Sequence, residues 1–290
     1  MGNSREIKKR MKAVSNIKRI TRTMQMIATS KFSKAQQAAT LSKPYTNGLF
    51  DLVAQLASAA GDIEHPLLDT ANPDAPELTL VIASDRGLCG PYNANIIRTA
   101  LNHIKGNQQA MQGPVEVVGK KGLTPLRFNG IEVSEHHTQF GDKPAYQDVE
   151  ALAERYMSLF EKGEISAVRV VSMKYYSAGK QVPTVARVLP FESEALENAG
   201  ESGPSLPYEF TPDAEELLAA LVPAAVKSVM FQIFNDAIVS EHVARMVAMK
   251  AATDNAGKMG KALKTKFNRA RQAQITTELT EIVSGAAALG

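Results

Sequence analysis

Apolar side chains recur every three or four positions along the first part of the chain. From Ile7 onward they lie at Met11, Val14, Ile17, Ile20, Met24, Ile27, Phe32 and Ala35. This spacing places them on one side of an α-helix, close to the coiled-coil repeat. Because no proline precedes Pro44, the pattern predicts one helix from about residue 4 to about residue 58. At ~1.5 Å per residue, such a helix is on the order of 80 Å long, which is too long for the interior of a compact domain.

The C-terminal segment carries a second helical pattern. Thr211 or Asp213 can cap a helix that begins near "DAEELLAAL", and Pro223 is a candidate kink within it. Gly257 and Gly260 each weaken a helix by ~1 kcal/mol relative to Ala, which predicts a soft spot and not an end. No proline follows Pro223, so the pattern predicts a helix approaching ~100 Å in length.

The middle of the chain has a different pattern, in which short Val- and Ile-rich runs alternate with helical ones. The runs at 77–84, 115–119, 131–138, 167–177 and 182–190 predict strands, and those at 91–105 and 145–163 predict helices. Alternation of strand and helix favours an α/β unit with a mostly parallel sheet. The Pro-, Gly- and Ser-rich stretch that follows is typical of a mobile loop, near 191–207.

These patterns predict three parts. They are an N-terminal coiled-coil helix at 1–60, an α/β globular domain at 61–210 and a C-terminal coiled-coil helix at 211–290. Each terminal helix carries an apolar stripe that it cannot bury alone, so the two should wind round each other as an antiparallel pair. The expected fold class is therefore α/β plus a long antiparallel coiled coil, with a central Rossmann-like α/β domain.

Charge is strongly segregated along the chain, although the net charge is only +3. Residues 1–43 hold 11 Lys and Arg against one Glu, and residues 245–290 hold eight against three acids, so the middle is acidic. Basic blocks of this kind indicate an acidic partner or nucleic acid. The longest apolar run, "LLAALVPAAV", is too short to cross a bilayer, so we expect no membrane insertion.

The single cysteine, Cys89, excludes an intramolecular disulfide and a CxxC site, which fits a reducing compartment. The N-terminus is basic and poor in acids, like a mitochondrial transit peptide. The helical pattern runs straight through it, however, and seven of its eleven basic residues are Lys, which argues against that interpretation.

Few stretches of the sequence suggest chemistry. "SDRGLCG" at 84–90 follows a predicted strand and precedes a helix with Pro91 at its expected first position, so its amides could cradle an anion. It lacks both GxxxxGK[ST] and GxGxxG, and a tight turn is the more frequent role. "VVGKKG" at 117–122 reads as a basic turn. His136 and His137 alternate sides of a strand, which favours a packed or solvated pair over a metal site. We therefore predict no catalytic, cofactor-binding or metal-binding residue and no cofactor.

Four stretches resemble the γ subunit family of F-type ATP synthases. They are "REIKKRMKAVSNIKRITRTMQMIATSKFSKAQQ", "SDRGLCG", "VPTVARVLP" and, above all, residues 240–289, which begin "SEHVARMVAMKAATDNAGKMGKALKTKFNRARQAQ". The resemblance implies a central rotor stalk, a coiled coil inside a ring of three α and three β subunits. It further implies an α/β foot against the ε subunit and the membrane c-ring. Such a stalk couples ion flow to ATP synthesis and hydrolysis on the ring without an active site of its own, at the cytoplasmic face of the bacterial inner membrane.

The resemblance also implies contacts between rotor and stator. Met24 in "TRTMQMIA" and Arg245 in "HVARMV" lie where the family's shaft meets the moving β subunits. Gln272, Thr276 and Glu278 in "ARQAQITTE" lie where it hydrogen-bonds loops inside the ring.

Two further expectations concern the ends of this shaft. Lys8, Lys9 and Lys12 should face acidic loops of the β subunits, because charge attraction can follow rotation without one locked geometry. Tyr208 falls in the stretch that contacts the c-ring in this family, although Thr211 stands where many relatives have Glu.

Two other classes of protein explain part of the pattern. A basic coiled-coil nucleic-acid-binding protein would account for the charged ends, and its retention on DNA should fall steeply with salt. It leaves the α/β segment unexplained. An α/β nucleotide enzyme would account for that segment, and it predicts stoichiometric nucleotide binding. It leaves the two long helices unexplained.

Overall fold

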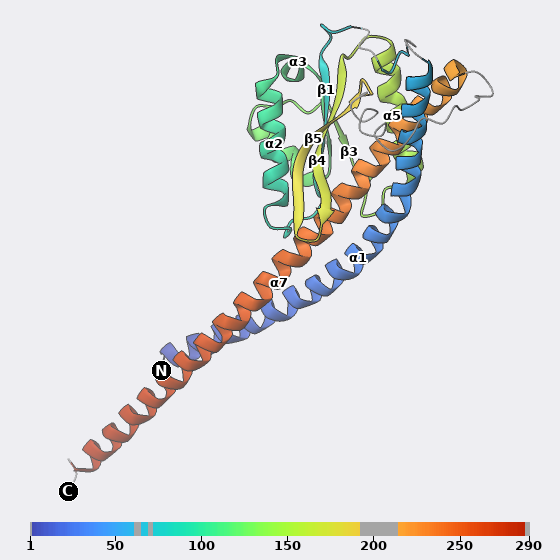
Figure 1. Ribbon diagram of the computed structural model, residues 1–290. Coiled ribbons are helices and arrows are strands. Elements are labelled where there is room, and N and C mark those ends of the chain that lie inside the picture. Colours follow the sequence, from blue (N-terminus) through green and yellow to red (C-terminus); the bar gives the residue numbers. More distant parts are fainter. Residues whose placement is uncertain (1, 61–64, 69–71, 192–213, 288–290) are drawn as a thin grey trace. The chain divides into compact units, whose positions relative to one another are not determined.

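The computed structural model describes residues 2–60, 65–68, 72–191 and 214–287 (Figure 1). Its contacts divide the chain into two compact units. The first, here called the coiled-coil unit, comprises Met1–Thr29 and Arg245–Gly290, and the second, the sheet unit, comprises Ser30–Ala244. The predicted domain boundaries near residues 60 and 210 remain predictions. Most of the predicted loop, at 192–207, lies outside the described residues, as do the predicted helix-capping residues Thr211 and Asp213.

Both long terminal helices are present. Helix α1 runs over Gly2–Ala60 and α7 over Ala214–Ala287, each as one continuous element. Pro44 lies inside α1 and Pro223 inside α7. Helix α7 also continues through Gly257 and Gly260, since the cost of two glycines is small beside the packing of a helix this long.

Within the coiled-coil unit, α1 and α7 pair in opposite directions. The Ser4 hydroxyl donates to Gln274 Oε1 at 3.1 Å, near the start of α1. Farther along α1, Thr21 Oγ1 lies 2.8 Å from Thr253 Oγ1, which is earlier in α7. The seam between these points buries small and apolar side chains, including Val14 and Ala256, and Met249 is buried one turn before Thr253 on α7. The predicted antiparallel coiled coil is therefore confirmed.

The sheet unit is built on one five-stranded sheet of order β3-β2-β1-β4-β5. The first four strands in this order run parallel to one another. Strand β5 runs antiparallel to β4 at one edge. Helices between successive strands provide the crossover connections that a parallel sheet requires. The predicted mostly parallel, Rossmann-like arrangement is therefore confirmed. The strands are β1 Glu77–Ile82, β2 Val115–Val118, β3 Glu135–His137, β4 Ala167–Ser177 and β5 Lys180–Leu189.

Helices cover both faces of this sheet. Within the described residues, the shorter helices are α2 Tyr92–Gly106, α3 Gln108–Gln112, α4 Lys120–Phe128 and α5 Tyr146–Glu161. One core packs side chains of α2 and α4, such as Ile96 and Leu126, against Val117 and Val171. The other packs α5 and parts of α1 and α7 against the opposite face of the same strands.

Two local predictions were wrong. The "VVGKKG" stretch is not a turn, because α4 begins at Lys120 directly after Gly119. Gly119 has φ +86°, and a Cβ there would lie 2.3 Å from the Ala83 carbonyl oxygen, so only glycine allows the strand to turn into the helix at this point. The Asp85 carboxylate then accepts the Lys120 N–H at 3.1 Å. Pro91 lies one residue before α2, at the N-cap, and not at its first position.

Helix α7 is unusually apolar in part. Among the described residues it alone is long and apolar enough to cross a membrane, with a mean hydropathy of 1.9 over its most apolar 18-residue window, of which 39% is buried. It also places Leu218, Val222, Met230 and Phe234 in the core of the sheet unit. Buried core helices pass the same test, so the apolar window is weak evidence for a membrane span.

Candidate functional site

The most distinctive surface of the coiled-coil unit is a zone of exposed basic side chains, here called the basic belt. Antiparallel pairing brings together cations from both ends of the sequence, between the Ser4–Gln274 contact and the approach of Val14 to Gly260. The single acid on this part of α1, Glu6, is paired with Arg10 at 2.6 Å. The belt consists of Arg5, Lys8, Lys9, Arg10 and Lys12 of α1 and Lys261, Lys264, Lys266, Arg269 and Arg271 of α7.

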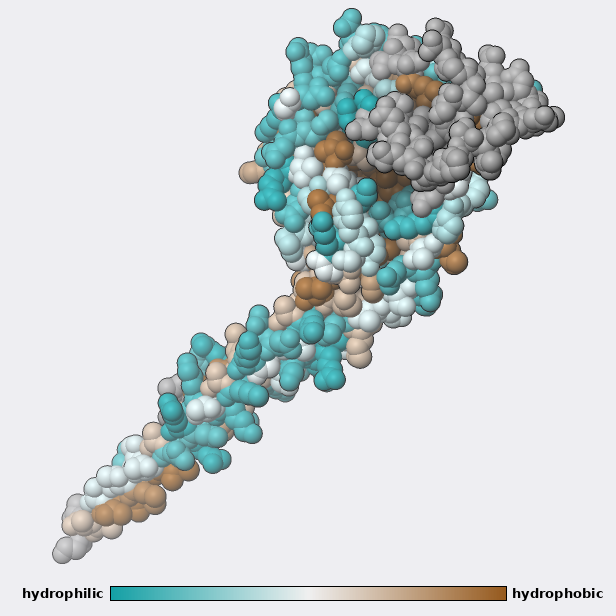
Figure 2. Space-filling view, in the orientation of Figure 1, coloured by the Kyte–Doolittle hydropathy of each residue, from teal (hydrophilic) through white to brown (hydrophobic). Residues whose placement is uncertain are grey.

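Beyond Gln274, helix α7 ends in an exposed apolar stripe, here called the apolar tip. Ile275, Leu279, Ile282 and Val283 are between 47% and 67% exposed and recur at helical spacing. Figure 2 shows apolar side chains gathered at this end of the helix. A stripe of large apolar residues that the chain itself leaves uncovered marks a contact surface for another molecule.

The structure describes all but one of the predicted contact residues. Lys8, Lys9 and Lys12 are exposed in the basic belt. Tyr208 lies outside the described residues. The other predicted contacts fall in the same coiled-coil unit: Met24 is half-buried and Arg245 is buried, whereas Gln272, Thr276 and Glu278 are exposed on α7.

Within α7, Gln272, Thr276 and Glu278 all take part in local hydrogen bonds. The Thr276 hydroxyl donates to the Gln272 carbonyl at 3.0 Å. The Glu278 carboxylate accepts from Gln274 Nε2 at 2.9 Å. Both bonds are exposed, so a partner's loop could compete for these groups at little cost.

The "SDRGLCG" loop of the sheet unit is tied to the start of α2 by side-chain contacts. Asn93 Oδ1 accepts the Ser84 N–H at 3.0 Å, and Asn93 Nδ2 donates to Cys89 Sγ at 3.3 Å. Cys89 is buried, which is typical of a free structural cysteine. Leu88 adopts φ +63°, a left-handed conformation that costs a non-glycine residue about 1–2 kcal/mol. These contacts bury Ser84 and Cys89 within the turn, whereas Arg86 is exposed.

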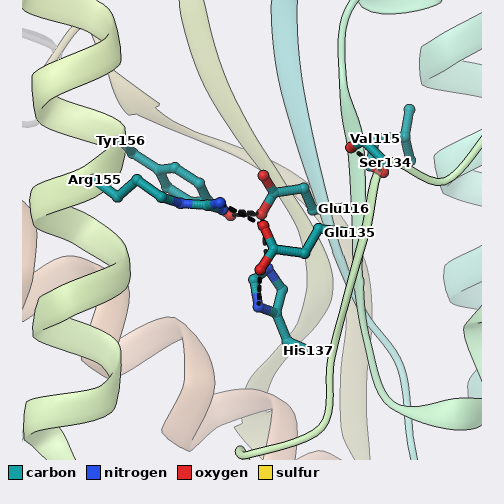
Figure 3. A network of polar contacts seen from close by, with 7 residues as sticks. All are labelled: Val115, Glu116, Ser134, Glu135, His137, Arg155 and Tyr156. Carbon is teal, nitrogen blue, oxygen red and sulfur yellow. Dashed lines mark hydrogen bonds and ion pairs between the residues drawn. The ribbon is translucent and has the colours of Figure 1, made fainter.

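A second polar cluster lies between β2, β3 and α5 (Figure 3). The Glu116 carboxylate, which is 6% exposed, is its centre. His137 Nε2 lies 2.7 Å from Glu116 Oε2, and the Tyr156 hydroxyl donates to the same oxygen at 2.6 Å. The Arg155 guanidinium donates both to Glu116 and to Glu135. This network ties edge strand β3 to its neighbour and to the helix above.

Protonation in the network follows from these contacts. Burial by itself would raise the pKa of Glu116, but hydrogen bonds from His137 and Tyr156 and the charge of Arg155 outweigh it and hold that pKa below its usual value. Burial and the Glu116 carboxylate raise the pKa of Tyr156 well above its usual value, so the phenol stays protonated and donates. Glu116 is therefore an anion held by three donors.

The same cluster contains a set of atoms that could ligate a metal. Glu116, Glu135 and His137 offer ligand atoms that lie within 4.8 Å of one another. The Arg155 guanidinium already neutralises both carboxylates, and a cation would have to displace it. The chemistry of this set therefore fits a structural ion-pair network better than a metal centre.

Sequence reasoning missed most of these polar partners. Asn93, Glu116 and Tyr156 lie in helical or strand patterns, and nothing in their neighbours marks them as parts of a network. The sequence shows His137 only as the neighbour of His136 and gives no sign of its partners in the network. Glu116, Glu135 and His137 share one face of the β2–β3 pair. His136 lies on the opposite face, because successive side chains of a strand alternate between the two faces.

The chain matches known proteins over its whole length. The family model described as ATP synthase matches residues 3–289. The ATP synthase gamma chain of Rhodopirellula baltica is 43% identical over 295 residues, covering 100% of this chain and 99% of that protein. The ATP synthase gamma chain of Leptospira biflexa is 39% identical, with complete coverage of both chains.

Solved structures share the fold at lower sequence identity. A chain of the Euglena gracilis mitochondrial ATP synthase, from a structure of OSCP, F1 and c-ring, matches with a TM-score of 0.66 at 17% identity, covering 99% of this chain and 95% of that one. A chain of the Tetrahymena thermophila central stalk and c-ring matches with a TM-score of 0.59 at 20% identity, covering 80% and 99%. The alternative of a nucleic-acid-binding coiled coil finds no support in these matches. Full-length identity of this order establishes that the chain belongs to the family of ATP synthase gamma chains.

Proposed function

We propose that this chain is the central rotor stalk of an F-type ATP synthase. It would couple ion flow through the membrane sector to ATP synthesis and hydrolysis on a ring of three α and three β subunits. Its other partners would be the ε subunit and the c-ring. Family membership and the shared fold with a chain of the Tetrahymena thermophila central stalk and c-ring support this role. The observation that carries the proposal is the antiparallel pairing of α1 with α7, seen at Ser4–Gln274 and Thr21–Thr253.

The coiled-coil unit would act as the shaft. Two helices wound together resist twisting better than one, and they leave no sheet edge that could stick to the stator. The basic belt, with Lys8, Lys9 and Lys12, would attract acidic loops of the β subunits at every angle of rotation. Long-range attraction of this kind does not require one docking geometry, which suits a turning part.

The remaining contact residues would divide the work along the shaft. Met24 and Arg245 would meet the moving β subunits, and Gln272, Thr276 and Glu278 would exchange their exposed local hydrogen bonds for bonds to loops inside the ring. The apolar tip would turn in an apolar sleeve of α and β subunits. Because the tip carries no charge there, no ion pair would hold the shaft at one angle of rotation. Tyr208 would belong to the foot that meets the c-ring.

We further propose that the chain has no active site, cofactor or metal of its own and acts only within the complex. It would lie at the cytoplasmic face of a bacterial inner membrane as a peripheral subunit, in a reducing compartment that suits the buried free thiol of Cys89. Residues 1–60 and 211–290 would form the coiled-coil helices and residues 61–210 the globular domain.

Co-expression with α and β subunits tests the proposal. A ring with ATPase activity should assemble only when this chain is present, and its rotation should drive proton pumping once the membrane sector is added. A chain that joins no such ring, or a ring whose coupled pumping is unchanged without it, would overturn the assignment.

A further inference from the structure

A groove of about 490 Å³ opens in the sheet unit, and none of its lining residues belongs to the Glu116 network. Strands β4 and β5 line one side of it with Ser172, Lys174 and Thr184. Ser172 and Thr184 are direct partners in the antiparallel ladder, so their side chains share one face of the sheet. The volume lies within the range that proteins use for small organic ligands.

The apolar part of the lining comes from two elements. Val229 and Ile233 lie one turn apart on α7, and Ala186 of β5 lines the same groove with a side chain small enough to leave space. The ring of Tyr176 extends the apolar surface at the end of β4 and is 52% exposed. A ligand with a flat or aliphatic body could bury itself here.

The polar part of the lining is charged and unbalanced. Asp236 is only 8% exposed and accepts a hydrogen bond from Gln232 Nε2 at 2.9 Å. Two cations act on this one carboxylate, Lys43 of α1 and Lys174 of β4. Burial raises the pKa of Asp236, while the Gln232 bond and both lysines oppose that rise.

Both lysines are exposed, so water screens the attraction of each ammonium group to Asp236. Lys174 Nζ also lies 5.5 Å from the centre of the Tyr176 ring, at the apolar side of the groove. One buried carboxylate against two exposed ammonium groups leaves a positive surplus beside an apolar surface. That combination is complementary to a molecule with one anionic group and an apolar body.

We propose that this groove is a binding site for a small amphipathic monoanion. A carboxylate or sulfonate head would lie between Lys43 and Lys174, and an aromatic or aliphatic body would pack on Val229, Ile233 and Ala186. Asp236 would repel ligands with a second negative charge. This proposal does not rest on the rotor role, because it is argued only from the residues that line the groove.

Titration with the fluorescent sulfonate 1-anilinonaphthalene-8-sulfonate tests the site on the full chain. The apolar tip could bind this probe too, so every titration uses the background Ile282→Ser/Val283→Ser. For a ligand of this size we expect one saturable site with a dissociation constant of about 20–100 μM. Decanoate, a carboxylate with an aliphatic body, should displace the probe. The absence of a saturable site up to 1 mM probe would overturn the proposal.

Substitutions of the two lysines and of Asp236 test whether the groove selects anions. Lys43→Gln/Lys174→Gln should weaken probe binding about tenfold or more, because both charge-assisted contacts are lost. The matched control Lys105→Gln, on the exposed side of α2, should leave the affinity unchanged. Asp236→Asn, which is nearly isosteric, should tighten binding several-fold by removing a repulsive charge. Equal affinity in the double lysine variant and the control, or weaker binding in the Asp236 variant, would show that the groove does not select anions.

Discussion

Thr21 of α1 and Thr253 of α7 place their hydroxyl oxygens 2.8 Å apart, although 232 positions separate them in the sequence. Both residues are buried in the coiled-coil seam, at 9% and 8% exposure. Each hydroxyl also lies near a carbonyl of its own helix, that of Lys18 at 3.1 Å and that of Met249 at 2.8 Å. A polar pair inside an apolar seam specifies register, because slippage in either direction would bury both groups opposite apolar side chains.

Replacing this pair with valine should therefore show coupling. Thr21→Val or Thr253→Val alone should lower the free energy of unfolding by about 1 kcal/mol, since each removes a buried hydrogen bond. The double variant should lose less than the sum, because two valines pack against each other without an unpaired hydroxyl. Urea unfolding of the full chain, read by circular dichroism, measures the cycle. Strictly additive losses would mean that the two hydroxyls do not interact.

Glu116→Gln should destabilise the sheet unit. The substitution keeps the shape of the side chain but removes the anion that His137, Tyr156 and Arg155 share, at a cost of about 1–3 kcal/mol at neutral pH. Thermal or urea unfolding measures the loss. The matched control is Glu164→Gln, an exposed position, which should change stability by less than about 0.5 kcal/mol.

The effect of Glu116→Gln should also depend on pH. The folded-state pKa of Glu116 lies below its usual value of 4.5, so its contribution to stability is complete above about pH 5 and is lost as the pH falls through the folded value. The difference in unfolding free energy between the original chain and the variant should shrink from pH 7 to pH 3. A difference that stays constant over this range would place the stabilising charge elsewhere.

Charge reversal in the basic belt should impair coupling more than charge removal. With Lys8, Lys9 and Lys12 all changed to Glu, the belt would repel acidic loops that the lysines attract. With all three changed to Gln, the attraction is only lost. We expect ATP-driven proton pumping at least about twofold lower in the Glu variant than in the Gln variant. Equal pumping in both would show that the sign of the charge at these positions is irrelevant.

Truncation after Glu281 should loosen assembly without abolishing rotation. It removes Ile282 and Val283, both 67% exposed, whose burial in a sleeve is worth roughly 1.5–3 kcal/mol each. Thermal dissociation of the reconstituted ring should therefore begin at a lower temperature, while ATPase activity persists. The full-length variant Ile282→Ser/Val283→Ser separates lost apolar contact from lost helix length. An equally stable truncated complex would show that this end of the tip makes no contact.

Leu88→Gly should stabilise the chain slightly. Leu88 has φ +63° and is 61% exposed, so its side chain costs conformational strain and gains little from burial. Glycine relieves the strain, although it adds entropy to the unfolded state, and the net gain should be up to about 1 kcal/mol. A lower melting temperature in this variant would mean that the leucine side chain makes a contact worth more than the strain.

The sequence pattern was sufficient to predict an element where its formation depends mainly on residues that are neighbours in the sequence. The strand pattern at 167–177 matches β4 residue for residue, because a strand buried over most of its length must be rich in β-branched side chains. It failed at Lys120, where the start of α4 depends on the approach of Gly119 to the Ala83 carbonyl and on Asp85 as a cap. The Asp85–Lys120 contact joins residues 35 positions apart, and Gly119 lies still farther from Ala83 along the chain, so no local window contains either pair.

The sequence by itself determined the two long helices, the α/β pattern between them and the basic character of both ends, since helical period, β-branched runs and charge are properties of neighbouring residues. Only the tertiary structure decided which residues meet. It paired Thr21 with Thr253, gathered cations from both ends into one belt, gave the buried Glu116 its three donors, and opened a groove beside Asp236. The reason is physical: side-chain hydrogen bonds, desolvation and cavities depend on distances in space, and these are fixed only when the chain has packed.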